Sequence, residues 1–288
     1  MQITFEHVNY IYNPDTIEEV AALKDVNVTV GGDNFIAVIG STGSGKSTFI
    51  QMMNGLLSPS TGRILYDGEE IFGQKEEKKL LRELRCRVGL TFQYPEHQLF
   101  ETDVYKDVAF GPKNQGKSKE ETDACVRKAL DAVGLGEEYY KKSPFELSGG
   151  EMRRAAIAGM LAMEPEMLIL DEPTAGLDPV GKIEILDKLK SIQQEMHITV
   201  VLVSHTMEEV ARYADRVIAL NKGEVLFDLP VKQAFADTDM LERAGLMAPP
   251  VRYFMQMLKG AGIDIDPGCI TVTQARDEIM RLLTDRQK

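Results

Sequence analysis

A glycine-rich run in the first fifth of the chain has the spacing of a phosphate-binding loop. It matches GxxxxGK[ST] and lies between the apolar run Phe35–Ile39 and a helical pattern over 48–57. Glycines let backbone N–H groups turn toward phosphates, and the N-terminus of the next helix adds its positive end. This strand–loop–helix context favours a phosphate site over a structural glycine-rich turn. The residues are Gly40, Ser41, Thr42, Gly43, Ser44, Gly45, Lys46, Ser47 and Thr48.

Four polar residues have predicted roles around such phosphates. Lys46 is expected to reach the terminal phosphates, and the Ser47 hydroxyl to be a Mg²⁺ ligand. Asp171 and Glu172 directly follow the apolar run Met167–Leu170. Because side chains alternate along a strand, the two carboxylates cannot share one role. We expect Asp171 to hold Mg²⁺ through water and Glu172 to polarise an attacking water, as phosphoryl transfer requires. Taken alone, the pair is also compatible with a strand entering a polar loop.

A second motif, Leu147 to Glu151, opens a helix rich in Ala, Ile and Met. Ser148 and Glu151 have the spacing of a capping box, which many helices use. A capping box does not need Gly149 and Gly150, which weaken the first helical turn. Glycines there let a phosphate approach bare N–H groups. We therefore interpret this segment as a second anion site.

The elements that position these residues alternate between strand and helix. Phe35–Ile39, Met167–Leu170 and Thr199–Val203 are apolar throughout, which is typical of strands buried on both faces of a parallel sheet. Each is followed by polar residues, so the chemistry is expected at the carboxyl ends of the strands. The sequence predicts an α/β fold: a P-loop NTPase core with a mainly parallel sheet.

Other stretches differ in pattern from this core. About residues 1–35 and 62–72 indicate an antiparallel β layer, with an Asp67-Gly68 turn signal. Residues from about 95 to 163 are mostly helical in pattern and indicate a helical insertion subdomain. The main domain is predicted over 1–229. Residues 230–288 form a small C-terminal extension, for which we expect a role in holding a dimer together.

The composition of the chain limits the classes of partner and metal site that are expected. The formal net charge is −12 and the three cysteines are widely spaced. We therefore expect no nucleic-acid partner, no disulfide framework and no zinc-ligand cluster. No apolar run approaches the roughly 20 residues needed to span a bilayer. Residues 1–5 lack the pattern of a signal peptide, so a cytoplasmic chain is expected, with any membrane contact made through another protein.

The motifs and their order resemble the ABC-type ATPases over residues 1–229. In chain order they are the phosphate loop, Gln93 after a strand, the Leu147–Gly150 signature, the acidic strand, Ala175–Asp178 and Ser204-His205. The resemblance implies that two such domains pair head to tail with ATP and Mg²⁺ between them. Each nucleotide is then held by the phosphate loop of one domain and by the signature of the other.

The resemblance also implies roles for individual residues. Ser148, Gly149 and Gly150 would serve the partner's ATP, and Asp178 would link the two half-sites. Gln93 would contact Mg²⁺ and the attacking water, while His205 would hold the γ-phosphate and order Glu172. Tyr12 lies where the family places an aromatic residue that stacks on adenine; its alternative is an exposed aromatic on a strand or turn. The family usually has Gln where this chain has Glu151, so that residue either weakens the partner's half-site or points away.

Several less specific sequence segments resemble the energy-coupling factor (ECF) group of vitamin and metal importers, and within it the second, A-prime, ATPase. They are Tyr94–Phe100, Ser143–Glu146, Met152–Gly159 and Leu241–Leu246 with Pro249-Pro250. This implies a heterodimer with a related ATPase, a transmembrane coupling protein and a separate substrate-capture membrane protein. The alternative is a conventional ABC importer of amino acids or metals with a homodimeric ATPase. A non-transport ABC protein is disfavoured, because the chain has neither long coiled coils nor a second cassette.

Overall fold

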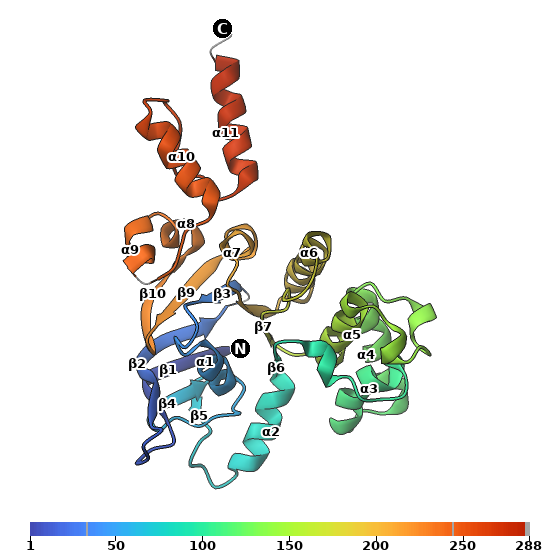
Figure 1. Cartoon of the computed structure of the whole chain (residues 1–288). Coiled ribbons are helices and arrows are strands. Elements are labelled where there is room, and N and C mark those ends of the chain that lie inside the picture. The colour runs from blue at the N-terminus through green and yellow to red at the C-terminus, as the bar shows by residue number, and fades with distance from the viewer. Residues whose placement is uncertain (33, 244, 286–288) are drawn as a thin grey trace.

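The computed structural model describes residues 1–32, 34–243 and 245–285 (Figure 1). The strands are β1 (Gln2–Tyr12), β2 (Val20–Gly31), β3 (Phe35–Ile39), β4 (Thr61–Tyr66), β5 (Glu69–Glu70), β6 (Val88–Thr91), β7 (Met167–Asp171), β8 (Thr199–Val203), β9 (Arg216–Asn221) and β10 (Glu224–Pro230). The α-helices are α1 (Lys46–Met53), α2 (Glu77–Arg87), α3 (Val104–Asn114), α4 (Lys119–Ala132), α5 (Gly149–Leu161), α6 (Pro179–Met196), α7 (Met207–Tyr213), α8 (Val231–Ala234), α9 (Thr238–Arg243), α10 (Pro250–Gly260) and α11 (Val272–Asp285). Short 3₁₀ helices are η1 (Pro95–Gln98), η2 (Glu137–Tyr139) and η3 (Pro144–Glu146).

The central sheet has the order β10-β9-β3-β8-β7-β6, and only β10 pairs antiparallel to its neighbour. Strands β3, β6 and β8 are buried along their whole length, and β7 up to its last residue, because both faces of the sheet are covered there. Along β3, Ile36 and Val38 join a core shared with α1 and the second sheet, whereas Phe35 joins the core beneath α4, α5 and α6. Parallel strands end at the same sheet edge, so the loops after β3, β6, β7 and β8 meet there. This arrangement brings distant motifs together, and it confirms the predicted α/β class.

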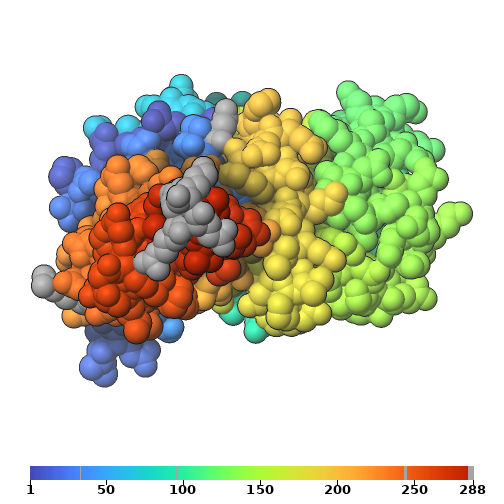
Figure 2. Space-filling view, turned by 90° about the horizontal axis from the view of Figure 1, so that it is seen from above, coloured from blue at the N-terminus to red at the C-terminus, as the bar shows by residue number. Residues whose placement is uncertain are grey.

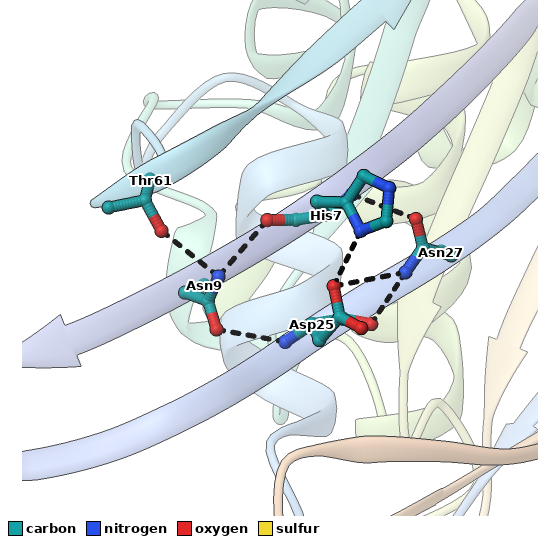
Figure 3. A network of polar contacts seen from close by, with 5 residues as sticks. All are labelled: His7, Asn9, Asp25, Asn27 and Thr61. Atoms are coloured by element: carbon teal, nitrogen blue, oxygen red, sulfur yellow. Dashed lines mark hydrogen bonds and ion pairs between the residues drawn. The ribbon is translucent and has the colours of Figure 1, made fainter.

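The second sheet, β2-β1-β4-β5, is antiparallel, as predicted for this layer. A bulge interrupts β1 and β2 where His7 and Asp25 both adopt positive φ, 51° and 46°. Figure 3 shows how a polar network closes this irregularity: His7 N donates to Asn27 Oδ1 at 2.8 Å, and His7 Nδ1 lies 2.8 Å from Asp25 Oδ1. The bulge lets Phe5 and Val8, which are three residues apart, both face the core.

Helices α3, α4 and α5 form a helical block between β6 and β7 in the chain, at one end of the molecule (Figure 1). The N-terminus of α4 has a capping box: Ser118 Oγ accepts from Glu121 N, and Glu121 Oε2 accepts from Ser118 N. Apolar residues of all three helices share one core with the sheet residues Leu168 and Leu170. The block is thereby packed onto the sheet edge next to β6 and β7.

The chain after β10 continues into short helices. Phe235 and Leu241, from the α8–α9 region, pack with α7 and β9 residues into a core next to the central sheet. Helices α10 and α11 project beyond it and share a small core of their own, which includes Met255 and Ala275. Figure 2 shows these helices over the end of the molecule away from the helical block. No helix in the described ranges has the length and apolarity needed to cross a membrane.

Candidate nucleotide site

The phosphate loop joins β3 to α1, so its backbone passes the N-terminus of α1. Gly43 and Gly45 have φ values of 78° and 101°, which side chains rarely adopt. A Cβ at Gly45 would lie 2.5 Å from the carbonyl oxygen of Ala22, so the loop needs glycine there for packing as well. Lys46 Nζ donates to Gly40 O at 2.8 Å and to Ser41 O at 2.9 Å. These contacts fold the ammonium group back over the loop.

Two features of the loop fit a bound polyphosphate. The buried Ser44 Oγ has no hydrogen-bond partner among the described residues, so a polar group facing the loop is left for a ligand. Burial lowers the pKa of Lys46, and the nearby carboxylates of Glu172 and Asp171 partly offset that effect. A cation that is partly removed from water gains most from an anionic ligand.

Asp171 ends β7, and Glu172 follows it into the loop. Burial first, and then the charge of Glu172, raise the pKa of Asp171 to about 6, while Lys46 acts in the opposite direction. Two neighbouring carboxylates at a buried strand end are unfavourable together without a cation. The donor set predicted for Mg²⁺ is Ser47, Gln93 and Asp171, all oxygen donors, which is the chemistry that Mg²⁺ prefers. The residues therefore fit this metal.

Two motifs that are far apart in sequence from Glu172 and from each other converge on its carboxylate. His205 Nε2, after β8, lies 2.8 Å from Glu172 Oε1. Gln93 Nε2, after β6, donates to Glu172 Oε2 at 3.3 Å. The Glu172 backbone has φ 49°, and its N–H donates to Val203 O at 3.0 Å, which fixes the start of the loop against β8. The carboxylate is thus aimed from both sides.

Tyr12, at the end of β1, lies beside the start of α1. Its hydroxyl is 3.1 Å from Thr48 Oγ1, and its ring packs edge-on against Tyr10 at 4.7 Å between centroids. The residue is 36% exposed. The structure places this aromatic residue next to the helix that follows the phosphate loop.

The signature residues are not brought to the phosphate loop of the same chain. Ser148, Gly149 and Gly150 start α5 in the helical block, apart from α1 in Figure 1. Glu151 points back into its own helix cap: Oε2 accepts from Ser148 N at 2.7 Å, and Oε1 accepts from the Tyr139 hydroxyl at 2.8 Å. These hydrogen bonds lower its pKa. Glu151 therefore acts as a capping residue, which is why a carboxylate is tolerated there.

Asp178 also occupies a helix cap in the single chain, because its Oδ1 accepts from Gly181 N at 2.7 Å at the start of α6. Three buried polar residues were given no role by the sequence: Arg153, Thr174 and Glu209. Arg153 Nη1 donates to Pro173 O at 2.7 Å and to Ala175 O at 2.8 Å, which ties α5 to the β7–α6 loop. Only a charged residue on an otherwise apolar helix face hinted at this contact.

Comparison with known proteins agrees with the fold. The family model described as ABC transporter matches residues 23–175. The chain belongs to the ABC transporter family, in which it is an ATP-hydrolysing cassette.

Relatives that match over their full length indicate which ABC ATPases this chain resembles most specifically. The chain is 49% identical over 287 residues to the energy-coupling factor transporter ATP-binding protein EcfA2 of Clostridium tetani, with 99% of each chain covered. It is 47% identical to EcfA2 of Clostridium perfringens, covering 98% of this chain and 99% of that one. These likenesses confirm the predicted resemblance to the ECF ATPases.

Solved structures show the same fold. CbiO1 from Clostridium perfringens, described as part of the ABC transporter complex cbiONQ, has a TM-score of 0.75 and 38% identity over 88% of this chain and 98% of its own. The ATP-binding cassette MJ0796, in a dimeric post-hydrolysis state bound to ADP and Pi, has a TM-score of 0.70 and 28% identity over 80% of this chain and 98% of its own.

Proposed function

We propose that the chain powers an ECF-type importer of vitamins or transition-metal ions, as one half of a head-to-tail ATPase dimer. One observation carries this proposal: Lys46, Asp171, Glu172 and His205 meet at one sheet edge, while the helix begun by Ser148 stands apart. A chain with a phosphate loop and a separate signature needs a second cassette to complete each site. We place it at the cytoplasmic face of the cell membrane, beneath a transmembrane coupling protein and with a substrate-capture membrane protein as a further partner.

In this mechanism the residues of the chain bind and orient ATP before they act on water. The loop N–H groups and Lys46 hold the phosphates, and Tyr12 supports the adenine. Ser47, Gln93 and Asp171 would hold Mg²⁺, which neutralises phosphate charge when it is bound.

Glu172 then orients the attacking water. His205, with a proton on Nε2, donates to Glu172 and keeps the carboxylate aimed, at the 2.8 Å separation seen here.

The chain also contributes its signature segment, at the start of α5, to the second half-site. Ser148, Gly149 and Gly150 present N–H groups and a hydroxyl to the partner's ATP, and Asp178 lies at the junction between the half-sites. Closure around ATP and reopening after hydrolysis form a two-state element biased by nucleotide affinity. We expect the C-terminal extension to hold the two ATPases together when the nucleotide sites are open.

Replacement of Glu172 by Gln tests the catalytic assignment. Gln cannot accept a proton from water, so ATP hydrolysis should fall by about 10²- to 10⁴-fold while ATP stays bound in a closed dimer. Glu195→Gln, an exposed glutamate on α6, is the matched control and should leave turnover unchanged. The measurements are phosphate release and nucleotide retention on gel filtration. Turnover near the wild-type rate in Glu172→Gln would overturn the role.

A gentle-detergent purification of the tagged chain from its native membranes tests the assembly. A second ATPase, a coupling membrane protein and small substrate-capture membrane proteins are the expected companions. Recovery of only this chain with a pair of permease subunits would instead indicate a conventional importer with a homodimeric ATPase.

A further inference from the structure

A buried carboxylate lies behind the Glu172–His205 pair. Glu209, on α7, is 8% exposed, and its Oε2 accepts hydrogen bonds from two hydroxyls. Ser204 Oγ donates at 3.0 Å, and Thr174 Oγ1 donates at 3.1 Å. Both donors are themselves buried, at 3% and 5% exposure. Lys182 Nζ on α6 is 3.8 Å from the other oxygen, Oε1, which makes no hydrogen bond within the described part of the chain.

The two hydroxyls belong to the two loops that carry the reacting side chains. Ser204 immediately precedes His205, and Thr174 is two residues after Glu172. Ser204 Oγ also accepts from Thr206 N at 3.0 Å, so this bond spans His205 and sets the turn in which the imidazole is held. Because the Ser204 proton is directed to Glu209, the lone pair of its oxygen is free for the Thr206 N–H.

One oxygen atom therefore joins both loops. A polar chain runs from Thr206 N–H through Ser204 to Glu209 and back to Thr174, with buried members throughout its centre. Networks of this kind in a low-dielectric interior fix geometry more firmly than exposed hydrogen bonds do. The separation between His205 and Glu172 depends on the relative placement of these loops.

We propose that Glu209 is a positioning residue for ATP hydrolysis, which sets the distance between His205 and Glu172 by joining Ser204 and Thr174. The inference rests on the proposed roles of Glu172 and His205. Glu209 is buried, and its hydrogen bonds go to the hydroxyls of Ser204 and Thr174, so its loss should slow the chemical step and leave nucleotide binding almost intact. A misplacement on the order of 1 Å at such a site costs about 100-fold in rate.

The test uses the full chain in the complex purified from its native membranes, with MgATP as substrate. Glu209→Ala should lower kcat by about 10- to 100-fold and change KM for ATP by less than about threefold. Glu209→Gln keeps an acceptor oxygen for the two hydroxyls and should recover part of the rate. Glu208→Ala is the matched control, since the neighbouring glutamate on the same helix is exposed. It should behave as wild type.

A double variant separates positioning from a general loss of structure. If Glu209 acts through His205, then His205→Ala combined with Glu209→Ala should be no slower than His205→Ala alone. If the double variant loses the product of the two single-variant factors in kcat, or if Glu209→Ala keeps the wild-type rate, the proposal is overturned. Should Glu209→Ala fail to fold, Ser204→Ala and Thr174→Val each remove one arm of the network. They should then show the same loss in kcat, and wild-type rates in both would overturn the proposal.

Glu172→Gln in the same preparation gives the lowest expected rate of ATP hydrolysis, with which the other variants are compared. If both Glu172→Gln and His205→Ala turn over like wild type, the proposed catalytic roles fail. If those two are slow and Glu209→Ala is at the wild-type rate, only the inference about Glu209 fails.

Discussion

Replacement of Arg153 by Met should destabilise the protein more than its distance from the phosphate loop suggests. Arg153 is 2% exposed, and its guanidinium donates to two backbone carbonyls, those of Pro173 and Ala175. Met keeps an unbranched apolar stem, but it has no donor and leaves both carbonyls without these hydrogen bonds. Each lost bond of this kind costs about 1.5 kcal/mol or more, so we expect a loss of about 3 kcal/mol in the free energy of unfolding.

Urea denaturation followed by circular dichroism measures this loss, and Arg127→Met is the control. Arg127 bonds two carboxylates, Asp123 and Glu137, but it is exposed. Exposed ion pairs contribute about 1 kcal/mol at most. Arg127→Met should therefore be the milder change although its partners are charged. A loss below about 1 kcal/mol in Arg153→Met would refute the reasoning, because burial would then not determine the strength of the contact.

The nucleotide site yields further predictions. Gly45→Ala should cost about 2–4 kcal/mol and abolish nucleotide binding, because its Cβ would meet Ala22 O at 2.5 Å; Gly43→Ala, with nothing within 4 Å, should cost about 1 kcal/mol. Thermal melts and nucleotide titrations measure both, and equal effects would contradict the steric argument. In the metal-free protein, stability should fall as pH rises from 3.8 to about 6, since the pKa of Asp171 is higher in the folded state than in the unfolded one. Asp171→Asn should remove this pH dependence, which amounts to about 2 kcal/mol in the free energy of unfolding after solvent screening. Urea denaturation at pH 4 and pH 7 measures it, and an unchanged difference between the two pH values would exclude Asp171 as its source. Glu151→Gln keeps an acceptor for the helix cap, so the free energy of unfolding should change by less than about 0.5 kcal/mol and ATP turnover should stay within twofold. A large rise in turnover would mean that the carboxylate weakens the partner's half-site.

The fold class was predictable because the signals were local. Uninterrupted apolar runs such as Phe35–Ile39 indicated strands buried on both faces, and the Asp67-Gly68 turn indicated the antiparallel layer. The bulge at His7 and Asp25 was not foreseen, because it depends on two strands meeting out of register across the sheet. His and Asp adopt positive φ more often than most residues, but that tendency alone does not place a bulge at these two positions.

The sequence by itself determined which chemistry the protein carries. Glycine spacing, the lysine after it and two carboxylates after an apolar strand identify a phosphate site, because phosphate binding needs these groups at short, fixed separations along the chain. Only the tertiary structure decided how the distant groups meet. The parallel sheet places His205 and Gln93 on Glu172, and it buries Glu209 between two loops 30 residues apart in sequence, at Thr174 and Ser204. Those contacts follow from strand order and burial, which are properties of the folded chain and not of any one segment.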